Sequence, residues 1–291
     1  MRTIDEVFLQ KPQSTLYHYT GIGSLMGIVD SKVLWASHIY YLNDSAEIIF
    51  ACHLLQDLVK ERLSGASQGE ADFLDEFHSW LGSFTNTAYH LFIFSLTEEG
   101  NLLSQWRSYT PHGKGVSIGF AAPFLVKKVQ EQNLRIAKCL YERDAQRALM
   151  NDLLERMLVS FVRERASINT AKFHPTQKYF GFMERFREDI LQVFALIKDQ
   201  AFRGEREWRI ISKYYPRYTV PEVKFREGAC MLVPYIEIPI GNKGNPDLLF
   251  ERIILGPTEH NNLSHSALSS YLSNKKVCNE TVSSGIPYRE W

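Results

Sequence analysis

The chain has 291 residues, among which 33 lysines and arginines balance 33 aspartates and glutamates to a formal net charge of zero. This balance excludes a protein coated with positive charge for nucleic acid, but it is compatible with a local basic surface. Hydrophobic residues make up 45% of the chain and charged residues 23%, as in ordinary globular domains, so neither extensive disorder nor a coiled coil is expected.

The four cysteines, Cys52, Cys139, Cys230 and Cys278, lie far apart and form no CxxC pair. This spacing predicts reduced thiols rather than a disulfide framework or a zinc site. The N-terminus lacks the apolar run of a signal peptide, and no stretch approaches the roughly 18 apolar residues of a membrane span. We therefore expect a soluble cytoplasmic protein without a membrane partner.

The first 120 residues predict strands and helices in turn. An aromatic strand at 16–20 is followed by a glycine turn and by a helix that Ser24 caps. A second strand covers 33–37, and the polar residues at 43–45 predict the cap of a long helix. The other elements expected in this part are a helix at 70–80 and strands at 91–96 and 115–120.

The rest of the chain predicts helices first and strands afterwards. Residues 143–201 have a charged helical pattern with a break near His174 and Pro175. Because strands occur at both ends of the chain without strict strand–helix alternation, we expect an α+β fold rather than a doubly wound sheet. The expected organisation is a single domain over 1–291 with a helical insertion at 121–201. The late strands are expected at 205–212, 230–238, 250–255, 276–282 and 286–289.

Two familiar site patterns are weak in this sequence. Gly21, Gly23 and Gly27 follow a strand and open a helix, but their spacing is one residue longer than in a dinucleotide-binding fingerprint. The strand before them is also aromatic and polar, whereas a parallel nucleotide-binding strand is a buried aliphatic run. A turn and a helix cap explain these glycines better. His260 and His265 lie in a polar stretch that predicts a solvated loop rather than a metal site.

The strongest candidates for chemistry are His18 and the segment 205–209. Alternation in the first strand directs His18 to one face of the sheet and Tyr17 and Tyr19 to the other. A strand at 205–212 would place Glu205, Glu207 and Arg209 on one face. Burying these charges requires mutual pairing or a ligand, while a ladder of surface ion pairs is the plain alternative.

Taken together, the motifs of the chain resemble a known bacterial family. The chain carries Leu16-Tyr17-His18-Tyr19-Thr20, Trp35-Ala36-Ser37, Leu42-Asn43-Asp44 with Glu47, Phe94-Ser95-Leu96, Trp106-Arg107-Ser108-Tyr109, Gly115 to Phe120, and Glu205-Arg206-Glu207-Trp208-Arg209. This ordered set, from Leu16 to Pro257, resembles the bacterial "domain of unknown function 2971" family. The layout of that family is in turn similar to the ADP-ribosyltransferase superfamily, including the enzymes that modify thymidine in DNA.

The resemblance implies a split β-sheet core of the ADP-ribosyltransferase type and NAD as the substrate. It implies Glu207 as the catalytic carboxylate near the ribose and Glu205 as the group that orients or deprotonates the acceptor. Three tyrosines, Tyr40, Tyr41 and Tyr109, compete as the residue that stacks on nicotinamide. The NAD-binding residues that it implies are His18, Tyr19, Thr20, Ser37, Asn43, Trp106, Arg107 and Tyr109.

The acceptor is expected to be a macromolecule. Residues 202–228 hold seven basic residues, four acidic ones and interleaved aromatics, a pattern suited to single-stranded nucleic acid, although an ordinary solvated hairpin has the same composition. Nucleic acid is therefore the preferred acceptor over protein, and the resemblance implies a toxin or phage-defence role with an antitoxin partner. The alternatives are a nucleotide or nucleic-acid binding module without turnover and a plain NAD glycohydrolase.

Overall fold

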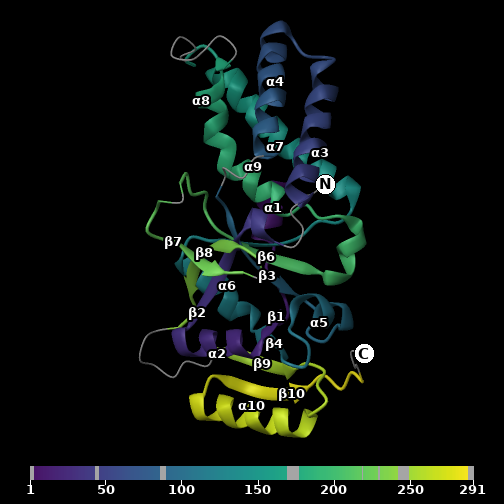
Figure 1. Cartoon of the computed structure of the whole chain (residues 1–291). Coiled ribbons are helices and arrows are strands. Elements are labelled where there is room, and N and C mark those ends of the chain that lie inside the picture. Colours follow the sequence, from purple (N-terminus) through teal and green to yellow (C-terminus); the bar gives the residue numbers. More distant parts are fainter. Residues whose placement is uncertain are drawn as a thin grey trace.

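The computed structural model describes residues 3–42, 46–85, 90–168, 177–217, 219–228, 230–241 and 249–287. Its centre is a mixed ten-stranded sheet in which β9 and β10 pair in parallel and every other strand pair is antiparallel. Helices lie on both sides of this sheet, so the predicted α+β class is confirmed (Figure 1). The strands are β1 (Leu16–Gly21), β2 (Val33–His38), β3 (Phe92–Thr97), β4 (Gly115–Phe120), β5 (Arg135–Lys138), β6 (Glu207–Ile211), β7 (Val223–Glu227), β8 (Leu232–Pro239), β9 (Phe250–Leu255) and β10 (Cys278–Ser283).

The sheet divides at β3. One edge of β3 pairs with β6 along its length. The other edge pairs with β2 at its start, where Ser37 is opposite Ile93, and with β1 at its end, where Tyr17 is opposite Thr97. Since β1 and β2 thus contact different ends of β3, the two strands separate from each other around Ser95.

Two hydrophobic cores cover the two faces of the sheet. One joins a helical bundle to Ile93 and Ile211, and the other packs three helices against Phe94 and Ile210. The bundle combines segments that are distant in sequence and stands above the sheet in Figure 1. Its main helices are α3 (Ala46–Leu63), α4 (Gln68–Leu81), α7 (Arg143–Glu164), α8 (Phe180–Met183) and α9 (Arg187–Phe194). The opposite face holds α2 (Ile22–Ser31), α6 (Ala122–Glu131) and α10 (Asn261–Lys275), and the other α-helices of the described residues are α1 (Ile4–Leu9) and α5 (Leu103–Tyr109).

Most early elements match the predictions to within a few residues. The strands expected at 16–20, 33–37, 91–96, 115–120 and 250–255 are confirmed, as is the helix at 70–80. The expected helix cap at 43–45 and the break at His174 and Pro175 lie outside the described residues.

Other predictions were wrong. The strand expected from Glu205 begins at Glu207, because residues 200–205 form a 3-10 helix that ends in a left-handed residue, Arg206, with φ of 45°. The segment 121–201 is not wholly helical, since it contributes β5 to the sheet. The expected loop around His265 is the helix α10, which two leucines four residues apart, Leu268 and Leu272, anchor to the sheet.

Within the described residues, no helix is both long and apolar enough to cross a membrane.

We expect the buried histidine His90 to make the fold sensitive to acid. The ring nitrogens His38 Nε2 and His90 Nδ1 lie 3.1 Å apart, and burial lowers the pKa of His90. The unfolded chain therefore takes up a proton at His90 as the pH falls below about 6.5, while the folded chain resists it, and stability decreases. We expect the urea midpoint to fall more between pH 7.5 and 5.5 in the wild type than in His90→Gln. Equal pH dependence of the two proteins would contradict this assignment.

Candidate active site

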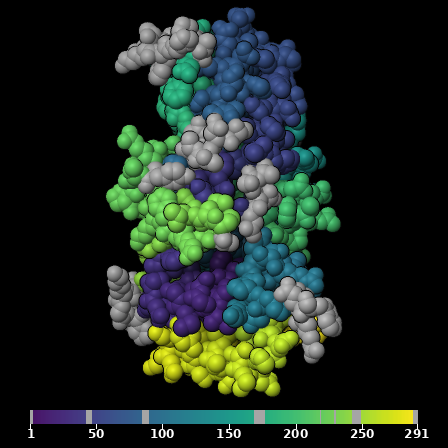
Figure 2. All heavy atoms as spheres, viewed as in Figure 1, coloured from purple at the N-terminus to yellow at the C-terminus, as the bar shows by residue number. Residues whose placement is uncertain are grey.

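A pocket of about 240 Å³ opens where β1 and β2 separate. Its floor consists of β3 and β6, and its walls come from α5 on one side and from the helical bundle on the other. In Figure 2 the N-terminal segment (purple), α5 (blue-teal) and the β7–β8 hairpin (light green) meet on one face of the molecule. The polar and charged side chains that line this pocket are those of Tyr17, His18, Tyr19, Ser37, Tyr41, Glu47, Ser95, Thr97, Gln105, Tyr109, Lys198, Glu205, Glu207, Arg209 and Arg226.

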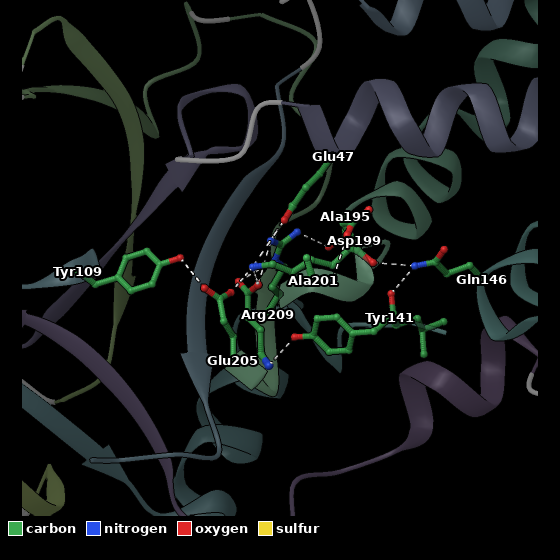
Figure 3. A network of polar contacts seen from close by, with 12 residues as sticks. Glu47, Tyr109, Tyr141, Gln146, Ala195, Asp199, Ala201, Glu205 and Arg209 are labelled. Atoms are coloured by element: carbon green, nitrogen blue, oxygen red, sulfur yellow. Dashed lines mark hydrogen bonds and ion pairs between the residues drawn. The ribbon is translucent and has the colours of Figure 1, made fainter. Parts of the chain in front are cut away.

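Five of these charged groups form one network (Figure 3). The guanidinium of Arg209 donates to both carboxylate oxygens of Glu207, at 2.8 and 3.0 Å, and to Glu47 at 2.7 Å. The ammonium of Lys198 donates to Glu207 at 2.7 Å and also to Glu205. Three carboxylates thus share two cations, and the network carries one net negative charge when all five groups are ionised.

The local backbone brings these side chains together. Gln146 on α7 donates to the carbonyl of Lys198 at 2.7 Å and thereby fixes the chain before the 3-10 helix. The left-handed conformation of Arg206 then turns the chain between Glu205 and Glu207. The Tyr141 hydroxyl accepts a hydrogen bond from the backbone amide of Glu207 at 2.9 Å. Although Glu205 is not on β6, its carboxylate still meets that of Glu207 at Lys198.

Burial and neighbouring charges act differently on the individual carboxylates. Burial alone would raise the pKa of Glu207, but Arg209 and Lys198 outweigh it and lower that pKa to about 2. Burial raises the pKa of Glu47 despite its contact with Arg209. Glu47 Oε1 has no hydrogen-bond partner in the described structure, and Lys198 Nζ lies 3.6 Å from it. This oxygen is therefore a buried acceptor that a ligand hydroxyl could satisfy.

Glu205 is the carboxylate that remains accessible. Its side chain is 17% exposed, compared with 7% for Glu207. The Tyr109 hydroxyl donates to Glu205 Oε1 at 2.9 Å. Burial and the charge of Glu205 raise the pKa of Tyr109, so its hydroxyl stays protonated and can hold the carboxylate in place.

His18 enters the pocket from the other side of the split. Its Nδ1 lies 2.9 Å from the carbonyl oxygen of Ser95, and its ring stacks on Phe94. Because a carbonyl can only accept, Nδ1 carries the proton and Nε2 is left as an acceptor. Burial lowers the pKa of His18, although the bond to Ser95 opposes this, and the ring is neutral near pH 7.

The two predicted residues that follow His18 on β1 have structural roles in the sheet. Tyr19 lines the pocket, but its hydroxyl donates to the Glu99 carbonyl and accepts from the Leu102 amide, which joins β1 to the start of α5. Thr20 pairs with Val116 in the sheet and is not among the residues that line the pocket.

Ser37 is held by a residue far away in the chain. Its hydroxyl accepts a hydrogen bond from Arg226 on β7 at 3.1 Å. No hydrogen bond joins Ser37 to Glu205 or Glu207 among the described residues. Arg226 itself lines the pocket.

Of the three predicted site residues on α5, one lines the pocket and two do not. Trp106 is a core residue that does not line the pocket: it is buried against Tyr19, and its Nε1 donates to Asn101 at 2.9 Å. Arg107 is exposed and does not line the pocket, whereas Tyr109 does. Asn43 lies outside the described residues.

The basic segment 202–228 does not form one positive surface. Arg209 is buried in the network, Arg206 pairs with Glu99, and Lys224 pairs with Glu237. These ion pairs neutralise much of the charge that suggested nucleic acid.

The sequence predicted no place in the site for Lys198, Glu47 or Arg226, although Arg226 belongs to the basic segment 202–228. Lys198 stands in a segment expected to be helical, with nothing beside it to indicate that it would face two glutamates. Glu47 belonged to the motif set that carries the family resemblance. The sequence did not indicate that its side chain, in the first turn of α3, is buried at 5% exposure.

Comparison with known proteins gives one family match. A family model described as "Protein of unknown function (DUF2971)" matches residues 105–210. This region extends from α5 to β6 and contains Tyr109, Lys198, Glu205 and Glu207, and the match supports the resemblance to that family. Neither the curated proteins nor the solved structures give a match.

Proposed function

We propose that the protein is an NAD-dependent ADP-ribosyltransferase that transfers ADP-ribose to a macromolecule, with nucleic acid as the first acceptor class to test. The observation that carries this proposal is the meeting of Glu205 and Glu207 at Lys198, in a pocket that opens opposite His18 where the sheet divides. A toxin or phage-defence role with an antitoxin partner is part of the proposal through the family resemblance alone.

The charge of the pocket suits this reaction. Transfer breaks the bond between ribose C1′ and the nicotinamide nitrogen, and nicotinamide leaves as a neutral molecule with the bonding electrons. Positive charge develops on the ribose, as it does in glycoside hydrolysis. The carboxylate of Glu207 is ionised at neutral pH because its pKa lies at about 2, and it would stabilise that charge.

Glu205 has the geometry to act on the acceptor. The acceptor nucleophile forms a bond to C1′ and must lose a proton, and the partly accessible carboxylate of Glu205 can receive it. Tyr109 and Lys198 keep this carboxylate in one orientation. The unpartnered Glu47 Oε1 and the unprotonated His18 Nε2 are acceptors suited to ribose hydroxyls.

The direct test uses NAD labelled at its adenylate phosphate, incubated with separate pools of cellular RNA, DNA and protein. We expect label on one pool and release of nicotinamide by the wild type, with the transfer of label lost in Glu205→Gln. The control is Glu98→Gln, which removes a carboxylate that pairs with Lys138 at 2.6 Å and does not line the pocket. Absence of both label and nicotinamide release, from folded protein with every pool, would contradict the proposal.

A second candidate is a nucleotide-binding module without turnover. It is favoured by the complete pairing of Glu207, whose two oxygens are taken up by Arg209 and Lys198. NAD binding with no nicotinamide release would identify this function, and free ADP-ribose without labelled acceptor would identify an NAD glycohydrolase.

A further inference from the structure

Trp35 is a large aromatic side chain left open at the pocket. It is 49% exposed, while its neighbours Leu34 and Ala36 are buried in the core on the opposite face of β2. The ring centroid of Trp35 lies 4.6 Å from that of Tyr235 on β8, at an interplanar angle of 35°. Tyr235 is itself buried and therefore supports the indole in place. Trp35 also lines the pocket.

A guanidinium, whose geometry suits phosphate, lies on the same side of the sheet as this ring. Trp35 and Ser37 are two residues apart on β2, so their side chains share a face about 7 Å apart. The Ser37 hydroxyl accepts from Arg226, which fixes the guanidinium at this position. Arg226 is the pocket-lining cation that the described structure does not pair with a carboxylate, whereas Lys198 and Arg209 are both paired.

The two ends of the pocket therefore differ in charge. Its inner end carries three carboxylates against two cations, and its outer end carries Arg226 and the exposed indole. A dinucleotide with a cationic nicotinamide ring, an anionic pyrophosphate and a neutral adenine has complementary polarity in one orientation. Nicotinamide faces the carboxylates, the pyrophosphate faces Arg226, and adenine reaches Trp35.

We propose that Trp35, supported by Tyr235, is a stacking platform for the adenine base of an adenine nucleotide whose phosphate contacts Arg226. This inference rests on the proposed use of NAD, but it concerns binding and does not require turnover. Stacking on an aromatic ring accounts for the otherwise unfavourable exposure of an indole. A base of single-stranded nucleic acid would be an alternative occupant, and the experiment below separates the two.

The test is calorimetric titration of the full chain with AMP, with nicotinamide mononucleotide and with a single-stranded oligonucleotide. Trp35→Ala is expected to weaken AMP binding about tenfold or more and to leave nicotinamide mononucleotide binding unchanged. Trp35→Phe should retain part of the AMP affinity, because phenylalanine still offers an aromatic face. Arg226→Ala should weaken binding of both mononucleotides, since each carries a phosphate.

The matched control is Phe225→Ala. Phe225 is an exposed aromatic residue next to Arg226, but neighbouring side chains of a strand face opposite sides of the sheet. AMP affinity should stay at the wild-type value in this variant, and the thermal midpoint of Trp35→Ala should match that of the wild type.

Several results would overturn the platform. They are undetectable AMP binding by the wild type, unchanged AMP affinity in Trp35→Ala, an equal loss for both nucleotides, or loss of oligonucleotide binding with AMP binding intact. The last result would assign the ring to a nucleic acid base instead. Nicotinamide release is measured separately, so AMP binding that depends on Trp35 without any release would refute the proposed reaction and leave the platform standing.

Discussion

Replacement of Glu205 by glutamine is expected to lower ADP-ribose transfer at least about 100-fold, the usual contribution of a positioned general base. Glutamine keeps the shape of the side chain and can still accept from Tyr109, but it cannot take a proton from the acceptor. Lys198 retains Glu47 and Glu207 as partners, so the unfolding free energy should change by less than about 1 kcal/mol.

The measurement is the initial rate of label transfer, with urea unfolding of the same protein samples. Glu98→Gln serves as the control, because it breaks an ion pair with Lys138 outside the pocket. A wild-type transfer rate in Glu205→Gln would exclude Glu205 from the chemistry.

Replacement of Glu207 by glutamine is expected to destabilise the protein by about 3 kcal/mol at pH 7. The arrangement around Arg209 and Lys198 lowers the pKa of Glu207 from 4.5 to about 2, and a shift of that size corresponds to this free energy. Glutamine also presents an amide N–H₂ to two cations that need acceptors. Loss of activity in this variant therefore reports on stability as well as on chemistry, and Glu205→Gln is the cleaner catalytic test.

The pH dependence of this effect has a definite sign. A lowered pKa means that the contribution of Glu207 to stability is complete above about 4.5 and is lost as the pH falls toward 2. The difference in urea midpoint between wild type and Glu207→Gln should thus be larger at pH 7 than at pH 3. A double variant, Glu207→Gln with Lys198→Met, should be less destabilised than the sum of its two single variants. Equal differences at both pH values would mean that the carboxylate is not held by these cations.

The sequence predicts the strands of this fold better than the geometry of its site. The strand at 115–120 is buried throughout and has a clear pattern, and it was predicted with its correct ends. The turn at Arg206 was not foreseeable, since a left-handed arginine has no signal of the kind that glycine gives. The polar helix α10 was missed because just two of its side chains are buried.

The residues of the candidate site also differ in how well the sequence predicts them. Glu205, Glu207, His18 and Tyr109 were predicted, and all four line the pocket. Lys198, Glu47 and Arg226 were not, because their roles depend on contacts between residues as many as 189 positions apart, such as that of Arg226 with Ser37. Pairing over such distances is fixed by the tertiary fold and leaves no local pattern.

The division of the bundle between two distant segments has a consequence for biosynthesis. Glu47 arrives on α3, but Lys198 and the two acidic residues that it holds are made about 150 positions later, and Arg226 later still. A nascent chain that ends before β6 also lacks the central strand that pairs with both β3 and β5. A nascent chain that ends before Arg226 therefore cannot hold the complete lining of the pocket, and the charged groups of the site come together only after residue 226 has been made.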